Sequence, residues 1–342
     1  MDNLYTTTLL TGVINQLKPD PKFFLEYFPS VVTHEQDTII FDQTGEDSLL
    51  VMPYAHPKSE AKSIEHAGYQ SKYFRPAYLK SKVVIDPENS QTRLPGEALG
   101  GSLSGAERER LLVAQILRQQ RESFDRRLEQ MACEILTTGK LNIRSKDEFD
   151  YTIDFERDEK LAKTLKGEEK WSSEKTDIVG QIEDFVQDVL DRSSGASVDT
   201  LVFGKNVWKH FRQNASVKEL LDIRRGSSTS FDIGPNQPIF GMQEKGYIGA
   251  YKICVHTGTY TDPFDNKMKR YVPENSVLLL SKHVEGTKHF ASIRDRSCQM
   301  KAVPYFVKAI ETQDPSNLYF LAQSAPLLVP KRINASSIVT VI

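Results

Sequence analysis

The sequence predicts an α+β fold in which one long helix is combined with strand-rich regions that are distant from it in the chain. Three observations indicate this fold class. A single helical pattern covers residues 104–139, strand-forming residues dominate 37–99, and helices and short buried strands are mixed from residue 176 onward. The 342 residues are enough for one large domain or for two to three smaller units, so we expect a packed core.

The composition is that of an ordinary globular protein. Apolar residues make up 39% and charged residues 26%, and a formal net charge of -2 gives the chain no general attraction to nucleic acid. The apolar run from Leu9 to Leu17 is interrupted by polar residues and follows no cationic segment, unlike a signal peptide. No stretch reaches the roughly 18 consecutive apolar residues of a membrane-spanning helix. We therefore expect a soluble protein that is made in a cytoplasm.

Residues 1–36 are predicted to form an N-terminal arm. A short helix candidate opens the segment, and Pro19, Pro21 and Pro29 prevent one continuous helix. The aromatic residues of "KFFLEYF" must pack against an apolar surface. That surface belongs either to the core of the same chain or to a second subunit, and the residues alone leave both options open.

Residues 37–99 are predicted to form strands that cannot fold by themselves. "DTIIFDQ", "DSLLVMPYA" and "YLKSKVVID" have the composition of strands, but the alternation of apolar and polar residues is poor. The stretch from Tyr73 to Glu97 is charged at nearly every third position. Because an isolated two-stranded hairpin is only marginally stable in water, this region needs a surface in its own chain or in a neighbour.

The pattern from Ser104 to Gly139 predicts one long helix. Ser104 and Glu107 have the spacing of a capping box, and Gly139 is a typical helix terminator. At about 1.5 Å per residue, roughly 35 residues extend over about 50 Å. Such a length indicates a scaffold element that is packed along only part of its surface. Its predicted apolar face consists of Leu112, Ile116, Phe124, Leu128, Met131 and Ile135.

Residues 176–297 are predicted to form a more compact unit. "TDIVGQIEDFVQDVLDRSSG" and "KNVWKHFRQ" are amphipathic helices, and "VDTLVFG" and "ENSVLLLSK" are buried-strand candidates. Residues 298–342 contain the further strand patterns "NLYFLAQSAPLLV" and "SSIVTVI". We expect these last strands to return to the region of the long helix, which otherwise has no sheet to pack against.

No motif for catalysis, metal binding or phosphate binding is intact. A Walker loop ending at Gly204-Lys205 would need glycine at position 199 and serine or threonine at 206, where the chain has Asp199 and Asn206. The seven histidines have no metal-ligand spacing, and the cysteines form no Cys-x-x-Cys pair. Reduced thiols are therefore expected, and neither a catalytic residue, a cofactor-binding residue nor a metal ligand is assigned.

Two basic segments could suggest nucleic-acid binding. Arg224 and Arg225 precede a Gly/Ser-rich loop, and "KYFRPAYLKSK" mixes aromatic and basic residues. A pair of arginines at a helix end also complements the negative pole of the helix, so a structural role or a subunit contact is the preferred interpretation.

Several short motifs together resemble a known family. In order along the chain they are "LYTTTLL", "FRPAYLKSKVVIDP", "TRLPGE", "LLDIRRGS" and "QSAPLL". Their order and spacing resemble those of the major capsid proteins of lambda-type tailed phages, from Leu4 to about Pro330. One departure is the glycine-rich run "ALGGSLSG" before the long helix, where a more polar and stiffer connection would be expected.

This resemblance implies the Hong Kong 97-type capsid fold. That fold has an N-terminal arm, an extended β-hairpin loop, a peripheral domain on a long spine helix and an α/β axial domain. The implied divisions are the arm at 1–36, the extended loop at 37–99, the first part of the peripheral domain at 100–175 with the spine helix at 104–139, the axial domain at 176–297, and the return to the peripheral sheet at 298–342.

The resemblance also implies a function and partners. It indicates a structural major capsid protein, not an enzyme, that assembles with itself into the pentamers and hexamers of an icosahedral shell. The shell would enclose double-stranded DNA without sequence-specific binding, in the virion of a phage or prophage. Implied partners are a scaffolding protein, a portal, a maturation protease and a head decoration protein, and neither a cofactor nor a membrane is implied.

Two alternatives remain open at this point. One is a bacterial compartment shell of the same fold, and the other is a soluble hydrolase or nucleic-acid-binding module, for which no motif is intact. If the chain does assemble, its charged and exposed segments are expected to contact neighbouring subunits. The candidate intersubunit contacts are Arg75, Arg93, Glu97, Arg224 and Arg225.

Overall fold

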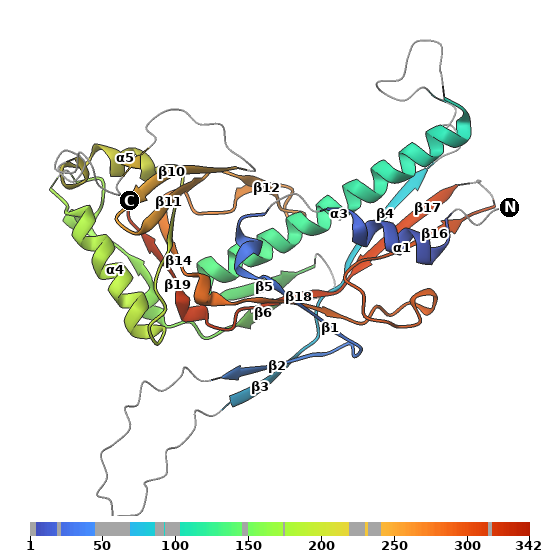
Figure 1. The fold of residues 1–342 in the computed structure, drawn as a ribbon, viewed down its shortest axis with the longest axis horizontal. Helices are drawn as coiled ribbons and strands as arrows, with labels where there is room; N and C mark the ends of the chain where they lie inside the picture. Colours follow the sequence, from blue (N-terminus) through green and yellow to red (C-terminus); the bar gives the residue numbers. More distant parts are fainter. Residues whose placement is uncertain are drawn as a thin grey trace, which may run out of the picture.

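The computed structural model describes residues 5–18, 22–44, 69–85, 92, 103–145, 150–173, 175–218, 230–231, 241–313 and 317–342. Helices and strands are mixed along the chain, as expected for an α+β fold. Figure 1 shows an elongated molecule in which the long helix α3 runs diagonally from one end toward the middle of the body. Buried residues form two hydrophobic cores, one along α3 and one around a seven-stranded sheet.

The helix α3 spans Gly105–Thr138, as the sequence predicted. The Ser104 hydroxyl accepts a hydrogen bond from the Glu107 amide, and the Glu107 carboxylate accepts one from the Ser104 amide at 2.8 Å, which completes the capping box. Gly139 ends the helix with a φ of 72°, a left-handed conformation that glycine adopts without strain. Of the predicted apolar face, five residues are buried: Ile116, Phe124, Leu128, Met131 and Ile135.

A three-stranded antiparallel sheet accompanies α3. Its order is β16-β17-β4, so a strand from the first hundred residues, β4, pairs with one from the last fifty, β17. Phe306 and Phe320 are buried from this sheet into the same core as α3. The strands are β4 (Leu79–Ile85), β16 (Phe306–Glu311) and β17 (Leu318–Ser324).

The N-terminal segment packs into the core of its own chain. Leu10, Ile14, Phe24 and Phe28 are at most 2% exposed, and all belong to the core along α3. This settles the choice that the sequence left open for the aromatic residues of the segment. The elements are α1 (Thr7–Gln16), the 3-10 helix η1 (Phe24–Tyr27) and β1 (Ser30–His34), and β1 pairs in parallel with β15 (Thr287–Ala291), which pairs with β18 (Pro326–Val329).

The second core surrounds a seven-stranded mixed sheet with β8 at its centre. All four residues of β8 are buried, and it pairs in parallel with β11 and antiparallel with β14. Helices α4 (Ile178–Arg192) and α5 (Val207–Gln213) contribute apolar side chains to this core. In sheet order the strands are β7 (Ala162–Thr164), β19 (Ser336–Thr340), β14 (Ser276–Leu280), β8 (Thr200–Phe203), β11 (Tyr251–His256), β10 (Met242–Ile248) and β9 (Ser230–Phe231).

The position of the last strand corrects one expectation. Residues 298–342 were expected to return together to the sheet beside the long helix, and β16 and β17 do lie there. β19 instead pairs with β14 and β7 in the seven-stranded sheet. The reason is burial: Val339 is 1% exposed in the second core, whereas Phe320 in β17 is buried in the first.

Three two-stranded hairpins complete the sheets of the described residues. They are β2 (Ile39–Thr44) with β3 (Tyr69–Phe74), β5 (Lys140–Arg144) with β6 (Asp150–Asp154), and β12 (Thr259–Thr261) with β13 (Met268–Arg270). The remaining elements are the 3-10 turns η2 (Glu159–Leu161), η3 (Gly167–Glu169), η4 (Lys282–Val284), η5 (Arg296–Cys298) and η6 (Ile333–Ala335).

Candidate functional site

The β2–β3 hairpin projects from the body of the molecule. In Figure 1 it extends below the molecule, away from α3. Within the described residues, β2 and β3 pair only with each other. Ile39 is buried at the base of the hairpin, but Ile40 is 42% and Tyr73 is 65% exposed. Because a two-stranded hairpin is marginally stable in water, this element is suited to contact a surface outside its own chain.

An ion-pair cluster fixes the base of the hairpin. The Asp37 carboxylate accepts a hydrogen bond from the guanidinium group of Arg294 and forms an ion pair with Arg75, whose Nη2 lies 3.2 Å from Oδ2 of Asp37. The bond from Arg294 is the main reason why the pKa of Asp37 lies below its usual range. Residues on both sides of the hairpin are therefore tied to the segment that follows β15.

Two tyrosines reinforce this attachment. The Tyr78 hydroxyl donates to the carbonyl of Ser292 at 2.9 Å and accepts from the amide of Arg294 at 3.0 Å. The Tyr151 hydroxyl donates to the carbonyl of Arg75 at 3.0 Å. These hydrogen bonds hold the base of the hairpin, which we call its root, in place. They thereby fix the direction of the hairpin relative to the body.

The structure places one of the five predicted contact residues. Arg75 lies at the root of the hairpin, where its side chain is 66% exposed and forms an ion pair within its own chain. The other four lie outside the described residues: Arg93, Glu97, Arg224 and Arg225.

Glu129 anchors the N-terminal segment, a role that the sequence analysis missed. This residue of α3 is 4% exposed, and its two carboxylate oxygens accept hydrogen bonds from the amides of Phe24 at 2.9 Å and Leu25 at 3.0 Å. Burial raises the pKa of Glu129 to about 7, against the opposing effect of these amide bonds. A charged residue on the apolar side of an otherwise amphipathic helix is the sequence signal that could have indicated this role.

The same segment also fits closely against a glycine. The amide of Gly286 donates to the carbonyl of Tyr27 at 2.8 Å, and a Cβ added to Gly286 would lie 2.2 Å from the Phe28 ring. Only glycine leaves room for the phenyl group at this point. Close packing and the carboxylate anchor together make the N-terminal segment part of the body in the isolated subunit.

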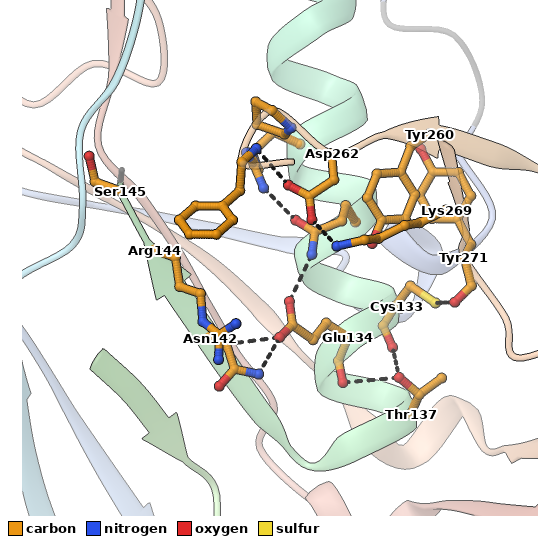
Figure 2. A pocket seen from close by; sticks show the side chains of 14 residues that line it. Cys133, Glu134, Thr137, Asn142, Arg144, Ser145, Tyr260, Asp262, Lys269 and Tyr271 are labelled. Carbon is orange, nitrogen blue, oxygen red and sulfur yellow. Dashed lines mark hydrogen bonds and ion pairs between the residues drawn. The ribbon is translucent and has the colours of Figure 1, made fainter. Parts of the chain in front are cut away.

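A groove of about 520 Å³ lies between α3, β5 and the β12–β13 hairpin (Figure 2). Its polar groups are bonded to one another. Glu134 accepts from the amide of Asn142 at 3.1 Å and from its side chain at 2.7 Å, and Lys269 forms ion pairs with Asp262 and Asp265. The groove is therefore a polar surface on which Glu134, Asp262 and Lys269 all have bonding partners.

Cys133 lies in the wall of this groove. Its thiol donates to the carbonyl of Tyr271 at 3.1 Å, and burial raises its pKa well above the ordinary value (Figure 2). The thiolate, which is the reactive form, is thus disfavoured. The groove therefore offers no activated sulfur.

Two features are absent from the part of the chain that the structure describes. No cluster of three or more histidine, cysteine, aspartate or glutamate side chains is arranged to hold a metal ion. No helix there combines the length and the hydrophobicity needed to cross a bilayer.

The fold is that of solved phage capsid proteins. A crystal structure of a prophage capsid protein from Escherichia coli CFT073 matches with a TM-score of 0.75 at 22% identity, over 98% of this chain and 99% of that chain. The capsid structure of cyanophage P-SCSP1u matches with a TM-score of 0.54 at 9% identity, over 95% of this chain and 89% of that chain. These matches confirm the predicted capsid fold.

The chain belongs to the phage major capsid protein E family, whose model matches residues 6–341. Over 333 residues it is 26% identical to the major capsid protein of Escherichia phage lambda, covering 96% of each chain. It is 27% identical to the P21 prophage-derived major head protein of Escherichia coli O6:H1 strain CFT073, covering 95% of this chain and 96% of that protein. The resemblance to lambda-type capsid proteins is thereby confirmed.

Proposed function

We propose that this protein is the structural subunit of a phage head and that it has no enzymatic activity. Copies of the chain would form pentamers and hexamers of an icosahedral shell around double-stranded DNA. The observation that carries the proposal is the family match, which extends over residues 6–341 and so includes both cores and the projecting hairpin. It favours a phage shell over a compartment shell of the same fold and over a hydrolase or nucleic-acid-binding module.

Assembly of this kind needs many contacts of moderate strength. A contact between two different surfaces of neighbouring subunits closes into rings when it is repeated by rotation. Each subunit then contacts several neighbours, and the contacts add up in the closed shell. The β2–β3 hairpin supports this function, because it carries exposed Ile40 and Tyr73 away from the body.

The division into structural units follows from the same proposal. Residues 1–36 would form the arm, 37–99 the extended loop, 100–175 the first part of the peripheral domain, and 176–297 the axial domain. Residues 298–342 would return to the peripheral domain, except that β19 belongs to the seven-stranded sheet with β14.

The charged residues at the predicted contacts would set register between subunits rather than supply much energy. Exposed ion pairs contribute about 0 to 1 kcal/mol each. Arg75 has a partner within the chain in Asp37, so a contact with a neighbour would share or exchange that partner. The same role is proposed for Arg93, Glu97, Arg224 and Arg225.

The proposed partners are those of a shell that is built in a bacterial cytoplasm and ends up in a virion. They are a scaffolding protein, a portal, a maturation protease and a head decoration protein. A formal charge of -2 is suited to a wall that encloses DNA without binding it sequence-specifically, since a strongly basic surface would retain the genome.

Electron microscopy of the purified protein tests the proposal. The protein should be imaged alone and after coexpression with the phage proteins encoded beside it. We expect rings, sheets or closed shells. A protein that stays strictly monomeric under all of these conditions would contradict the proposed function.

A further inference from the structure

Helix α1 covers the outer edge of strand β16. Its side chains form hydrogen bonds with this edge that a neighbouring strand would otherwise form. In the sheet of order β16-β17-β4, β16 pairs with β17 on one side only. Helix α1 lies along its other side (Figure 1). Open strand edges are sites at which another strand can add, and proteins commonly cover them.

Thr11 occupies the place of a residue on a neighbouring strand. Its hydroxyl donates to the carbonyl of Val307 at 3.1 Å and accepts from the amide of the same residue at 3.2 Å. In an antiparallel sheet, one residue of a partner strand would satisfy both of these backbone groups. The side chain of one threonine therefore forms both backbone hydrogen bonds of Val307, near the start of the edge.

Asn15, one helical turn further along, extends the same contact. Its side-chain amide donates to the carbonyl of Tyr305 at 2.8 Å, two residues before Val307 on the same edge, and to the carbonyl of Thr11 at 2.7 Å. Residues two apart in a strand direct their backbone groups to the same side. Two side chains at helical spacing thus bond to consecutive outward positions of one strand edge.

The attachment of α1 is apolar on its inner side and exposed on its outer side. Leu10 and Ile14 are buried, while Leu9 is 53% and Val13 is 38% exposed. The carboxyl end of the helix is held by Arg121 of α3, which donates to the carbonyl of Ile14 at 3.1 Å. A helix of ten residues has little stability of its own, so its position depends on these contacts.

We propose that the edge of β16 is a strand-addition site for a second copy of this chain and that α1 is the cover that occupies it in the free subunit. Two β16 edges can pair antiparallel across a two-fold axis, with Val307 of each copy opposite Val307 of the other. The choice of a second copy as the partner rests on the proposed function, because a shell subunit accumulates in many copies. As long as α1 covers the edge in the free subunit, two β16 edges cannot pair.

A double substitution that removes only the polar contacts tests this proposal. Thr11→Val with Asn15→Leu places apolar side chains of similar size at these two positions of α1, and it deletes their hydrogen bonds to β16. The matched control is Thr8→Val with Gln16→Leu, which makes the same kinds of change at exposed positions of α1. Amide hydrogen exchange of the peptide containing Val307 and sedimentation are measured on full-length protein, in a buffer in which the unchanged chain is a monomer.

At concentrations at which the test variant is still a monomer, we expect exchange at Val307 to be about tenfold faster than in the control, because its amide has lost the Thr11 hydroxyl as acceptor. At higher concentrations we expect the variant to self-associate in sedimentation and exchange at Val307 to slow again, while the control does neither. Unchanged exchange in the monomeric variant, or faster exchange without association at any concentration, would overturn the proposal.

A third substitution locates the association. Ala309 is two residues from Val307, so its amide also points away from β17, and Ala309→Pro blocks strand addition without disturbing the β17 ladder. Added to the double variant, it should restore a monomer while exchange at Val307 stays fast. Association that survives Ala309→Pro would show that another surface is responsible and would overturn the proposal. Shell formation of the unchanged protein, seen by electron microscopy, decides separately whether the proposed function holds.

Discussion

The central strand β8 and the projecting strand β2 belong to the same chain but obtain their stability in different ways. β8 is paired on both sides, and all four of its residues are buried. β2 has six residues and, among the described strands, pairs only with β3, and its residue Ile40 is 42% exposed. The sheet around β8 therefore holds the subunit together, and the hairpin contributes little to it.

This difference indicates how folding and assembly are separated in the molecule. Residues that stabilise the subunit lie in the two cores, whereas the hairpin is only rooted there by Asp37, Tyr78 and Arg294. A change in the cores should therefore impair folding, and a change in the hairpin should leave folding intact. The following predictions start from the largest expected effect.

The largest effect is expected from Phe203→Ala in β8. Phe203 is fully buried, and its ring centroid lies 5.8 Å from that of Trp171 and 5.0 Å from that of Phe211. We expect a loss of about 3 to 5 kcal/mol in the free energy of unfolding, measured in urea. The control on the hairpin is Tyr73→Ala, which should change it by about 0.5 kcal/mol or less. Equal losses in the two variants would refute the separation.

Glu129→Ala should have the next largest effect. The substitution leaves the buried amides of Phe24 and Leu25 without their acceptor, at about 1 to 3 kcal/mol for each unsatisfied group. We expect a loss of about 2 to 4 kcal/mol and faster hydrogen exchange in η1. Glu122→Ala, on an exposed face of the same helix, serves as the control. If both variants behaved alike, Glu129 would not be the anchor of the N-terminal segment.

Acid should destabilise the body through its buried histidines. His289 is 9% exposed and lies with Nδ1 2.8 Å from Nε2 of His34, and burial lowers its pKa from 6.5 to about 4. The unfolded chain therefore takes up a proton near pH 6.5 and the folded chain only near pH 4, so stability falls as the pH is lowered between these values. After allowance for remaining solvent contact, we expect this histidine to account for about 2 kcal/mol.

The variant His289→Gln should therefore show a shallower loss of stability between pH 6.5 and 4 in urea titrations at several pH values. His283→Gln, at an exposed position, should keep the slope of the unchanged protein. An unchanged slope in His289→Gln would assign the acid sensitivity to other groups.

The smallest effect on global stability is expected from Asp37→Asn. This carboxylate joins Arg75 and Arg294 at the root of the hairpin. We expect an unchanged midpoint of urea unfolding but faster hydrogen exchange in β2 and β3, because the root is loosened. Asp150→Asn removes an exposed ion pair with Arg144 from a different hairpin and should leave exchange in β2 and β3 unaltered. If the two variants exchanged at the same rate there, the root would not depend on Asp37.

Local sequence signals predicted the helices well. Ser104, Glu107 and Gly139 define both ends of α3 by hydrogen bonds within a few residues of the chain, so the pattern is readable without the fold. The amphipathic character of α4 was predicted for the same reason, and Ile178, Ile182, Phe185 and Val189 are buried on one side of it, with Val186 partly buried.

Long-range pairing was not predictable from the same signals. β19 has the composition of any buried strand, and only the positions of β14 and β7 determine that it joins the seven-stranded sheet. The parallel pairing of β1 with β15 joins residues more than 250 positions apart. Among the site residues, Arg75 was singled out for its charge, whereas its partner Asp37 could not be identified without the turn of the chain that brings them together.

The most direct test replaces the outer part of the hairpin, residues 41–72, by an Asn-Gly turn. This change retains Ile39 and Phe74 at the root and leaves β4 paired with β17. Electron microscopy and urea unfolding are then compared with those of the unchanged protein under conditions in which the latter forms shells. We predict a folded subunit with an unchanged unfolding midpoint and no shells. Closed shells formed by the shortened protein would contradict the conclusion that the hairpin finds its packing partner on a neighbouring subunit.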